Sequence, residues 1–298
     1  MPKRPHVVIV GAGFGGLATA KGLRTADVDV TLIDKRNHHL FQPLLYQVAT
    51  AGLSPADIAA PIRAIVKDSP NTKVVLDRVY GVDTAHKHII LGDCEPMAYD
   101  WLVIATGARH SYFGRDEWAP FAPGIKTIED ATAVRRKVLM ALERAENETD
   151  PDKRHALLTF AIIGGGPTGV EMAGAIAELA RQAVSKDFRS ITPHCSRIIL
   201  VQHADRLLPS FPESLSAKAK KSIEQLGVEV RLGERVESVT AEGVIVGDQF
   251  IAAATAIWAA GVQASRAAEW LGVAPDRAGR VPIGPDLRVS GIDSVFVI

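Results

Sequence analysis

One stretch near the start of the chain, from His6 to Asp34, constrains the fold more than any other. It reads as an apolar strand, a turn with Gly11, Gly13 and Gly16, an Ala- and Leu-rich helix, and a second strand. Gly11 allows the tight turn, Gly13 lets the backbone approach a pyrophosphate, and Gly16 permits close packing of helix on strand. The carboxylate of Asp34 can accept hydrogen bonds from both ribose hydroxyls. The stretch therefore predicts a site for an adenine dinucleotide.

The same pattern recurs later in the chain. Val8–Leu17 aligns with Ala161–Val170 at an offset of 153 residues, and Leu102–Ala108 aligns with Ala256–Val262 at an offset of 154. Two separate landmarks kept at nearly one offset indicate two copies of one domain. We therefore expect an α/β fold of two tandem Rossmann-like domains, the first made of residues 1–112 plus 281–298 and the second of residues 113–280.

Local patterns predict the elements of both copies. We expect helices over 15–26, from Ser54–Asp57, over 129–148 with Asp150-Pro151 ending it, from 168 past 179, and over 212–226. We expect antiparallel strands at 72–76, 79–82 and 87–91, and further strands at 157–163, 197–202, 228–231, 235–240, 243–246 and 294–298, the last returning to the first domain. Residues 35–49 are apolar but irregular, which favours a loop that lines a ligand, and residues 108–126 form the crossover linker.

Charge and cysteine usage exclude several classes of protein. Lys plus Arg and Asp plus Glu are equal at 34 each, so no global field recruits nucleic acid or an anionic membrane. Cys94 and Cys195 form no C-x-x-C pair, which argues against a dithiol relay and fits a reducing compartment. The first strand starts too early for a signal peptide, and no apolar run is long enough to span a bilayer, so we expect a cytoplasmic chain.

Three motifs together resemble the type II NADH dehydrogenases, the single-subunit, non-pumping NADH:quinone oxidoreductases of respiratory chains. They are His38–Ala49 (HHLFQPLLYQVA), Gly164–Glu171 (GGGPTGVE) and Trp258–Val262 (WAAGV). The resemblance covers the whole chain. It implies a flavoprotein with two dinucleotide-binding domains, as in glutathione reductase, with FAD in the first domain, NADH in the second, and a membrane quinone as electron acceptor.

The resemblance also assigns residues. The FAD fingerprint is matched by Gly11, Gly13, Gly16 and Asp34, the turn beside the flavin cofactor by Ala105, Thr106 and Gly107, and the backbone contact to adenine by Val79. The NADH turn is matched by Gly164, Gly166, Thr168 and Gly169, the carboxylate near the flavin by Glu171, and the turn facing the nicotinamide by Ala260 and Gly261. Lys35 and Arg36 could contact the cofactor phosphates or form a solvated pair.

Two departures from the family pattern bear on function. The final strand stops at Ile298, before the Gly-Asp pair, quinone-site residues and membrane-anchoring helices of the family, so we expect a C-terminally truncated chain. Gln202 stands at the end of the second strand of the NADH domain, where the family has Glu. A neutral side chain there should tolerate NADPH, with His203 and Arg206 able to assist.

Several alternatives stay open at this stage. Glu171 either gates the nicotinamide and relays a proton or only places a favourable charge in the first turn of a helix. His38 and His39 complete no metal site and fit loop contacts near FAD better, and Phe41, Pro43, Leu44 and Tyr46 either wall the flavin or pack in a core. The chain itself is the NADH:quinone oxidoreductase, a non-catalytic nucleotide-binding remnant, or another pyridine-nucleotide flavoprotein reductase. The longer form would bind the cytoplasmic face of the inner membrane peripherally, and a homodimer is left open.

Overall fold

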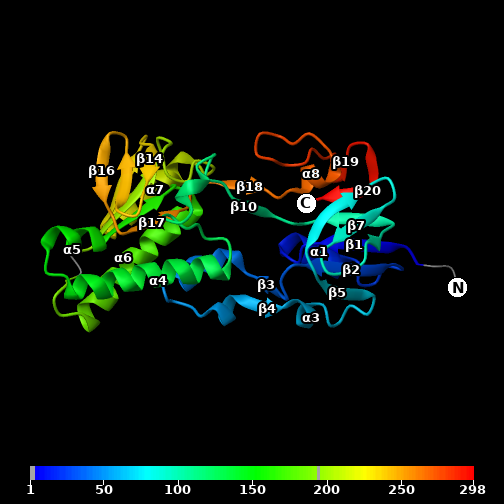
Figure 1. Ribbon diagram of the computed structural model, residues 1–298, viewed down its shortest axis with the longest axis horizontal. Coiled ribbons are helices and arrows are strands. Elements are labelled where there is room, and N and C mark those ends of the chain that lie inside the picture. Colours follow the sequence, from blue (N-terminus) through cyan, green and yellow to red (C-terminus); the bar gives the residue numbers. More distant parts are fainter. Residues whose placement is uncertain (1–3, 193–194) are drawn as a thin grey trace. The chain divides into compact units, whose positions relative to one another are not determined.

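The computed structural model describes residues 4–192 and 195–298, which form two compact units (Figure 1). Unit 1 consists of Met1–Phe41, Ala59–Arg109 and Val262–Ile298, and unit 2 of Gln42–Ile58 and His110–Gly261. The chain thus leaves unit 1 and returns to it twice. Among the described residues, no helix is both long and apolar enough to cross a membrane.

The main sheet of unit 1 has six strands and is almost entirely parallel. Its order is β19 (Arg288–Val289), β20 (Ile292–Val297), β9 (Trp101–Ile104), β1 (His6–Val10), β2 (Asp29–Asp34) and β5 (Thr72–Leu76), and only the β19–β20 pair is antiparallel. The central strand β1 is buried from Val7 to Val10, as expected for a strand covered on both faces. The predicted return of the last strand is confirmed, because Val295 pairs with Leu102 of β9.

The prediction that residues 72–76 belong to an antiparallel meander is wrong. β5 extends the parallel sheet, with Val74 opposite Leu32 of β2. The Asn71 side chain anchors its start by donating to the carbonyls of Leu23 (2.9 Å) and Val28 (3.1 Å) ahead of β2. The short alternating pattern did not reveal this long-range contact.

Smaller elements complete unit 1. Helix α1 runs over Phe14–Gly22 and is shorter than predicted, and the meander contains β6 (Val79–Asp83), β7 (His88–Leu91) and β8 (Met97–Ala98). Residues 35–49, expected to be irregular, instead hold β3 (His38–Leu40) in unit 1, followed by a 3₁₀ turn (Gln42–Leu44) and α2 (Leu45–Ala49), which belong to unit 2. β3 pairs with β4 (Ala59–Pro61), which leads into α3 (Ile62–Ile65), and α8 (Ala267–Leu271) packs on β6. β10 (Ala108–His110) and β18 (Val262–Ala264) form a two-stranded sheet.

Unit 2 repeats the topology of unit 1. Its parallel sheet has the order β13 (Val228–Leu232), β12 (Arg197–Gln202), β11 (Thr159–Ile163) and β17 (Thr255–Trp258), which corresponds to β5, β2, β1 and β9. A meander of β14 (Val236–Val239), β15 (Gly243–Val246) and β16 (Gln249–Ala252) follows β13. The helices are α4 (Ile128–Asn147), α5 (Pro151–Leu157), α6 (Pro167–Asp187) and α7 (Glu213–Gln225), with 3₁₀ turns at Pro55–Ile58 and Asp116–Trp118. The predicted α/β fold with two Rossmann-like copies is confirmed.

Helix capping explains where α4 and α5 begin. Thr127 and Asp130 form a capping box at the start of α4. Asp150-Pro151, predicted only to end this helix, starts the next one: the Asp150 carboxylate accepts from the N–H groups of Asp152 and Lys153, and Pro151 occupies the first helical position.

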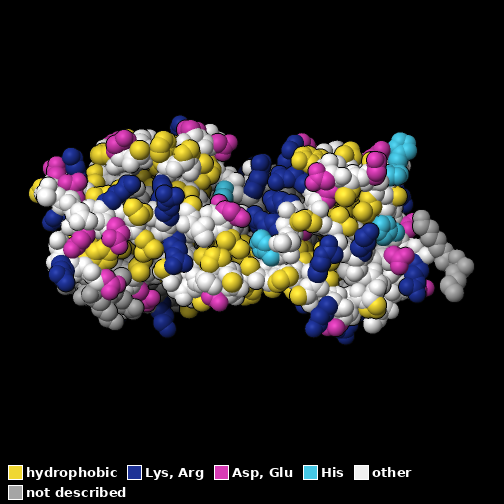
Figure 2. Space-filling view, turned by 60° about the horizontal axis from the view of Figure 1, so that its bottom comes forward, with side chains coloured by type: hydrophobic (Ala, Val, Ile, Leu, Met, Phe, Trp, Pro, Cys, Tyr) yellow, Lys and Arg dark blue, Asp and Glu magenta, His cyan; other side chains and the backbone are white. Residues whose placement is uncertain are grey.

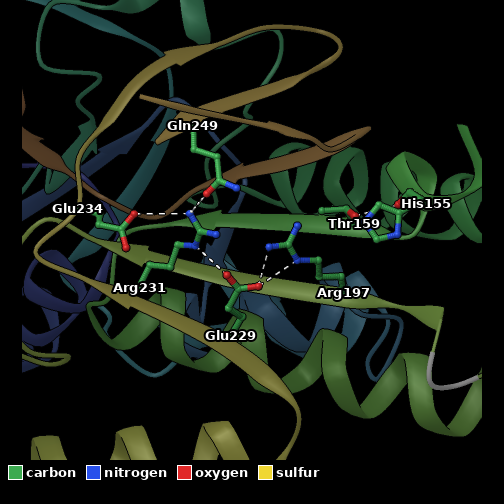
Figure 3. Close-up of polar contacts among 7 residues, drawn as sticks. All are labelled: His155, Thr159, Arg197, Glu229, Arg231, Glu234 and Gln249. Carbon is green, nitrogen blue, oxygen red and sulfur yellow. Dashed lines mark hydrogen bonds and ion pairs between the residues drawn. The ribbon is translucent and has the colours of Figure 1, made fainter. Parts of the chain in front are cut away.

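An ion-pair network ties the edge of the unit 2 sheet to its meander (Figure 3). Glu229 on β13 accepts from the Arg197 guanidinium on β12 at 2.8 and 2.9 Å and from Arg231 Nε at 2.7 Å. Arg231 also donates to Gln249 on β16 at 2.8 Å and lies 3.6 Å from the Glu234 carboxylate. The face of the protein seen in Figure 2 carries interspersed acidic and basic side chains, which agrees with the balanced charge of the sequence.

Candidate nucleotide-binding sites

The glycine turn of unit 1 has the geometry that its spacing predicts. Gly11 has a φ of +102°, and a Cβ on Gly16 would overlap the Gly11 carbonyl oxygen. Around Gly13, by contrast, no atom of the described chain beyond its immediate neighbours lies within 4 Å of where a Cβ would be. Gly13 is also the N-cap of α1, and no side chain of the described residues caps it. The first N–H groups of the helix are therefore free to bind an anion.

Asp34 is held against this turn at the end of β2. Its Oδ2 accepts from the Ala12 N–H at 2.7 Å, and its Oδ1 accepts from the Arg36 N–H at 2.8 Å. Each carboxylate oxygen keeps a further lone pair. The half-buried carboxylate can therefore accept hydrogen bonds from ribose hydroxyls, as the sequence predicts.

A cavity of about 380 Å³ in unit 1 brings several predicted residues together. Gly11, Asp34, Lys35, Val79 and Thr106 all line it. Its wall also includes side chains that sequence reasoning missed: Asp77, Arg78, Tyr80, Arg109, Ser265, Arg266 and Trp270. They come from segments far apart in the chain and belong to no local motif.

The turn at Ala105–Gly107 contributes Thr106 to this cavity and also to a second one. The second hollow, about 450 Å³, is lined by Gly107, Ala264, Val281 and Ile298 and shares Thr106 with the first. The Ala105 N–H donates to the Val10 carbonyl at 2.8 Å, which holds this turn beside the glycine loop. The Thr106 and Ser265 hydroxyls lie 2.5 Å apart.

Asp77 fixes the corner between β5 and β6 where Val79 meets the cavity. Its buried carboxylate accepts from the backbone N–H groups of Arg78 (2.6 Å), Gly92 (3.2 Å) and Cys94 (3.0 Å). Burial alone would raise the pKa of Asp77, but the hydrogen bonds from Cys94, Arg78 and their neighbours lower it on balance. Asp77 therefore stays ionised and holds the corner that carries Val79 in place.

The glycine turn of unit 2 repeats these contacts. Gly164 has a φ of +113°, a Cβ on Gly169 would overlap the Gly164 carbonyl, and no described atom lies within 4 Å of a Cβ on Gly166. Gly166 is the N-cap of α6, with Pro167 and Thr168 in its first turn. The Gly165 N–H donates to Gln202 Oε1 at 2.8 Å, which mirrors the bond from Ala12 to Asp34.

One prediction about unit 2 needs correction. Glu171 does not lie in the first turn of α6; it is the fifth residue, so the first turn holds no acidic side chain. Partial burial raises the pKa of Glu171, although its side chain still reaches solvent. The Arg206 guanidinium donates to two carbonyls of its own loop, those of Pro209 (2.8 Å) and Phe211 (3.2 Å).

Ala260 and Gly261 lie beside the glycine turn of unit 2. A Cβ on Gly164 would come within 2.5 Å of Ala260 Cα. The Gly261 carbonyl accepts from the Ser111 N–H at 3.2 Å, and the Ser111 carbonyl accepts from the Trp258 indole at 2.8 Å. This network holds the end of β17 next to the N-terminus of α6.

The described residues contain no cluster of His, Cys, Asp and Glu suited to a metal ion. His38 bonds to Asn37 at 3.1 Å, whereas His39 bonds to the Ala12 carbonyl at 3.0 Å, so the two rings have separate partners. Cys94 and Cys195 are free thiols. In the segment that follows His39, Phe41 is exposed and belongs to unit 1, whereas Leu45 and Val48 are buried in unit 2.

Comparison with known proteins identifies the family. Residues 5–298 match the family model for pyridine nucleotide-disulphide oxidoreductases. The chain is 46% identical to the type II NADH:quinone oxidoreductase Ndh of Mycobacterium tuberculosis and 45% identical to NdhA of the same organism, covering 100% and 99% of this chain and 67% and 66% of the relatives. The NDH2 structure from Plasmodium falciparum in complex with NADH aligns with a TM-score of 0.91 at 25% identity, covering 99% of this chain and 64% of that one.

The fold and paired sites thus define a pyridine nucleotide-dependent oxidoreductase with two dinucleotide-binding units. Within that class, the chain belongs to the type II NADH:quinone oxidoreductases, which use FAD and NADH. It spans about two thirds of the length of these relatives.

Proposed function

We propose that the whole protein transfers a hydride from NADH to FAD and passes the electrons to a quinone. The observation that carries this proposal is the repeated glycine turn, in which both units leave the N-terminus of a helix open to a diphosphate. We assign FAD to unit 1 and NADH to unit 2. When bound, the flavin supplies the redox chemistry, and the protein supplies binding and orientation.

In unit 1, we assign three tasks to residues of the glycine turn and of the cavity. Gly11, Gly13 and Gly16 let the backbone approach the diphosphate, Asp34 accepts from the ribose, and Val79 offers its backbone to the adenine. Lys35 lines the same cavity, which favours contact with the cofactor over a purely solvated role. Trp270 supports the fit, since its indole N–H is buried at the wall without a hydrogen-bond partner among the described residues.

In unit 2, we assign Gly164, Gly166, Thr168 and Gly169 to the NADH diphosphate. Ala260 and Gly261 would lie on the nicotinamide side. Glu171 is assigned to the reaction as the carboxylate near the flavin, where its raised pKa makes it easier to protonate than an ordinary glutamate. This would let it hold or release a proton as the quinone is reduced.

We further propose that the protein accepts NADPH as well as NADH. Gln202 Oε1 is used by the Gly165 N–H, which leaves the amide group of Gln202 to donate toward a ribose substituent. A neutral donor does not repel a 2′-phosphate as a carboxylate would. Because Arg206 is bound to its own loop, exposed His203 is the nearer candidate to assist.

The acceptor implies a place in the cell. A membrane quinone can be reached only at a bilayer surface, so we propose peripheral attachment to the cytoplasmic face of the inner membrane. Flotation of the full-length protein with liposomes tests this attachment. Sedimentation of the same preparation tests for a homodimer.

The visible spectrum of the purified 298-residue chain with added FAD tests the core of the proposal. Flavin absorbance that bleaches with anaerobic NADH, and returns on addition of a water-soluble quinone, is the expected result. A chain that folds and binds NADH without retaining flavin would contradict the assignment of unit 1. Repeating the titration with NADPH measures the nucleotide preference.

A further inference from the structure

The peptide groups on both sides of Ala12 are held by contacts outside the glycine turn. The Ala12 N–H donates to Asp34 Oδ2 at 2.7 Å, and the Ala12 carbonyl oxygen lies 3.0 Å from His39 Nδ1. A carbonyl oxygen only accepts, so Nδ1 of His39 carries the proton and donates. The turn is therefore fastened by one side chain at its N–H and by another at its C=O.

The direction of the Ala12 carbonyl determines the direction of the next N–H. In a planar trans peptide, the C=O of Ala12 and the N–H of Gly13 point in opposite directions. Holding the carbonyl toward His39 thus turns the Gly13 N–H to the other side, at the open N-terminus of α1. Without this bond, the glycines on both sides of Ala12 would let the peptide rotate easily.

We propose that His39 is a positioning residue for the cofactor diphosphate, because its Nδ1–H holds the Ala12 carbonyl and so directs the Gly13 N–H toward the phosphate oxygens. This inference rests on the proposed binding of FAD in unit 1. It assigns His39 no direct contact with substrate or with the reacting atoms.

Unit 2 contains the same arrangement with a different donor. Gly165, the counterpart of Ala12, donates its N–H to Gln202 and accepts at its carbonyl from the Leu208 N–H at 2.8 Å. Leu208 follows Gln202 by six residues, and His39 follows Asp34 by five, so both donors come from the segment after the second strand. Leu208 adopts a φ of +49°, a conformation that costs energy for a leucine. The equivalent carbonyls of Ala12 and Gly165 are thus each held by a hydrogen bond, from different kinds of donor, which indicates that the direction of this carbonyl matters in a dinucleotide-binding turn.

The surroundings of His39 fix its ring in this role. Its backbone pairs with Ala60 of β4, and the Phe14 ring meets it edge-on with centroids 5.1 Å apart. Phe14 in turn packs edge-on against Phe41 at 5.5 Å. These contacts hold the imidazole beside the turn, whereas the neighbouring His38 bonds to Asn37.

Substitutions can separate the donor from the ring. His39→Phe keeps an aromatic ring against Phe14 and removes the donor, while His39→Asn can place an amide N–H where Nδ1 stands. His39→Gln has the same amide but moves it toward the Nε2 position. His38→Phe is the control for a ring change in the same strand.

The test measures FAD affinity of the full chain and the displacement of bound FAD by ADP and by adenosine. Because FAD gives the signal, only its own site is read. We expect His39→Phe and His39→Gln to weaken FAD binding about tenfold or more, the effect of losing the hydrogen bond from the Gly13 N–H to the charged phosphate. His39→Asn and His38→Phe should bind FAD nearly as the wild type does. In His39→Phe the affinity for ADP should fall toward that for adenosine, while the affinity for adenosine stays unchanged.

Three results would overturn the inference. FAD affinity in His39→Phe equal to wild type would show that the donor is dispensable, and equal weakening of ADP and adenosine would show a general loss of structure. Should His39→Phe fail to fold, equal affinity of the Asn and Gln variants would contradict a role for the donor position. A wild-type chain that binds no FAD would overturn the proposed function together with this inference, and the two failures are thereby distinguished.

Discussion

We expect Gly16→Ala mainly to lower stability and Gly13→Ala mainly to lower FAD affinity. A Cβ on Gly16 would overlap the Gly11 carbonyl oxygen, lie 2.9 Å from its carbon and lie 3.4 Å from Ile9 Cγ2. Because backbone atoms cannot move aside, we expect Gly16→Ala to lower the free energy of unfolding by about 3 kcal/mol or more, the upper end for overpacking. Gly13 has an ordinary φ of −73° and open space around it. Gly13→Ala should therefore cost no more than about 1 kcal/mol, the usual effect of alanine at an N-cap.

FAD binding, unlike stability, should be impaired in the folded Gly13→Ala protein. The methyl group of Gly13→Ala would stand on the open side of the turn, where the diphosphate is assigned, so FAD affinity should fall at least tenfold in a protein that remains folded. Urea unfolding and FAD titration measure the two quantities on the same samples. A Gly16→Ala protein as stable as wild type, or a Gly13→Ala protein that unfolds readily, would refute the steric reasoning.

The repeat supplies the matched control. Gly169 faces the Gly164 carbonyl as Gly16 faces that of Gly11, and Gly166 is as open as Gly13. Gly166→Ala should weaken NADH binding and leave FAD affinity near its wild-type value. Loss of FAD in that variant would contradict the assignment of one nucleotide to each unit.

Three further predictions concern unit 2. Gln202→Glu should raise the preference for NADH over NADPH about tenfold in flavin-reduction assays, and an unchanged ratio would refute the role given to this side chain. Because partial burial raises the pKa of Glu171, the rate of quinone reduction should have a pH-dependent limb that Glu171→Gln removes; identical pH profiles would count against Glu171. Burial opposes ionisation of Glu229, but Arg231 and Arg197 lower its pKa on balance, so its contribution to stability is present above the unfolded pKa and is lost as pH falls through the folded one. Glu229→Gln should therefore cost about 1 kcal/mol at neutral pH, and the difference from wild type in urea unfolding should vanish in acid.

Steric requirements that act within a few residues were readable from the sequence. The tight approach of Gly16 to Gly11 recurs at Gly169 and Gly164, so the repeat marked both strand–turn–helix units correctly. Elements whose place depends on distant partners were misjudged. β5 looked like a meander strand because its parallel pairing with β2 is fixed partly by Asn71, which reaches back to the carbonyls of Leu23 and Val28.

In the candidate sites too, residues placed by their near neighbours in the sequence were predicted, and residues placed by distant partners were missed. Asp34 was predictable because it ends the strand next to the glycine turn, and Gln202 occupies the same place in unit 2. Asp77, Ser265 and Trp270 were missed, although they line the same cavity as Asp34. Asp77 stabilises a corner through backbone N–H groups up to 17 residues away, and no residue spacing signals such a contact.

The two copies also show why aligning them does not reveal the bond that His39 makes to the glycine turn. Equivalent strands of the two sheets, β1 with β11 and β9 with β17, are separated in the sequence by nearly the same number of residues. The segments that connect the strands differ between the copies, since α1 has 9 residues and α6 has 21. Within these variable connections, the donor to the turn carbonyl is an imidazole in unit 1 and a backbone N–H in unit 2. A backbone donor leaves no trace in the identity of Leu208, so aligning the copies gives no reason to single out His39. What is repeated is the direction of a peptide group, and side chains of different chemistry can fix that direction as long as each places a donor at the same carbonyl.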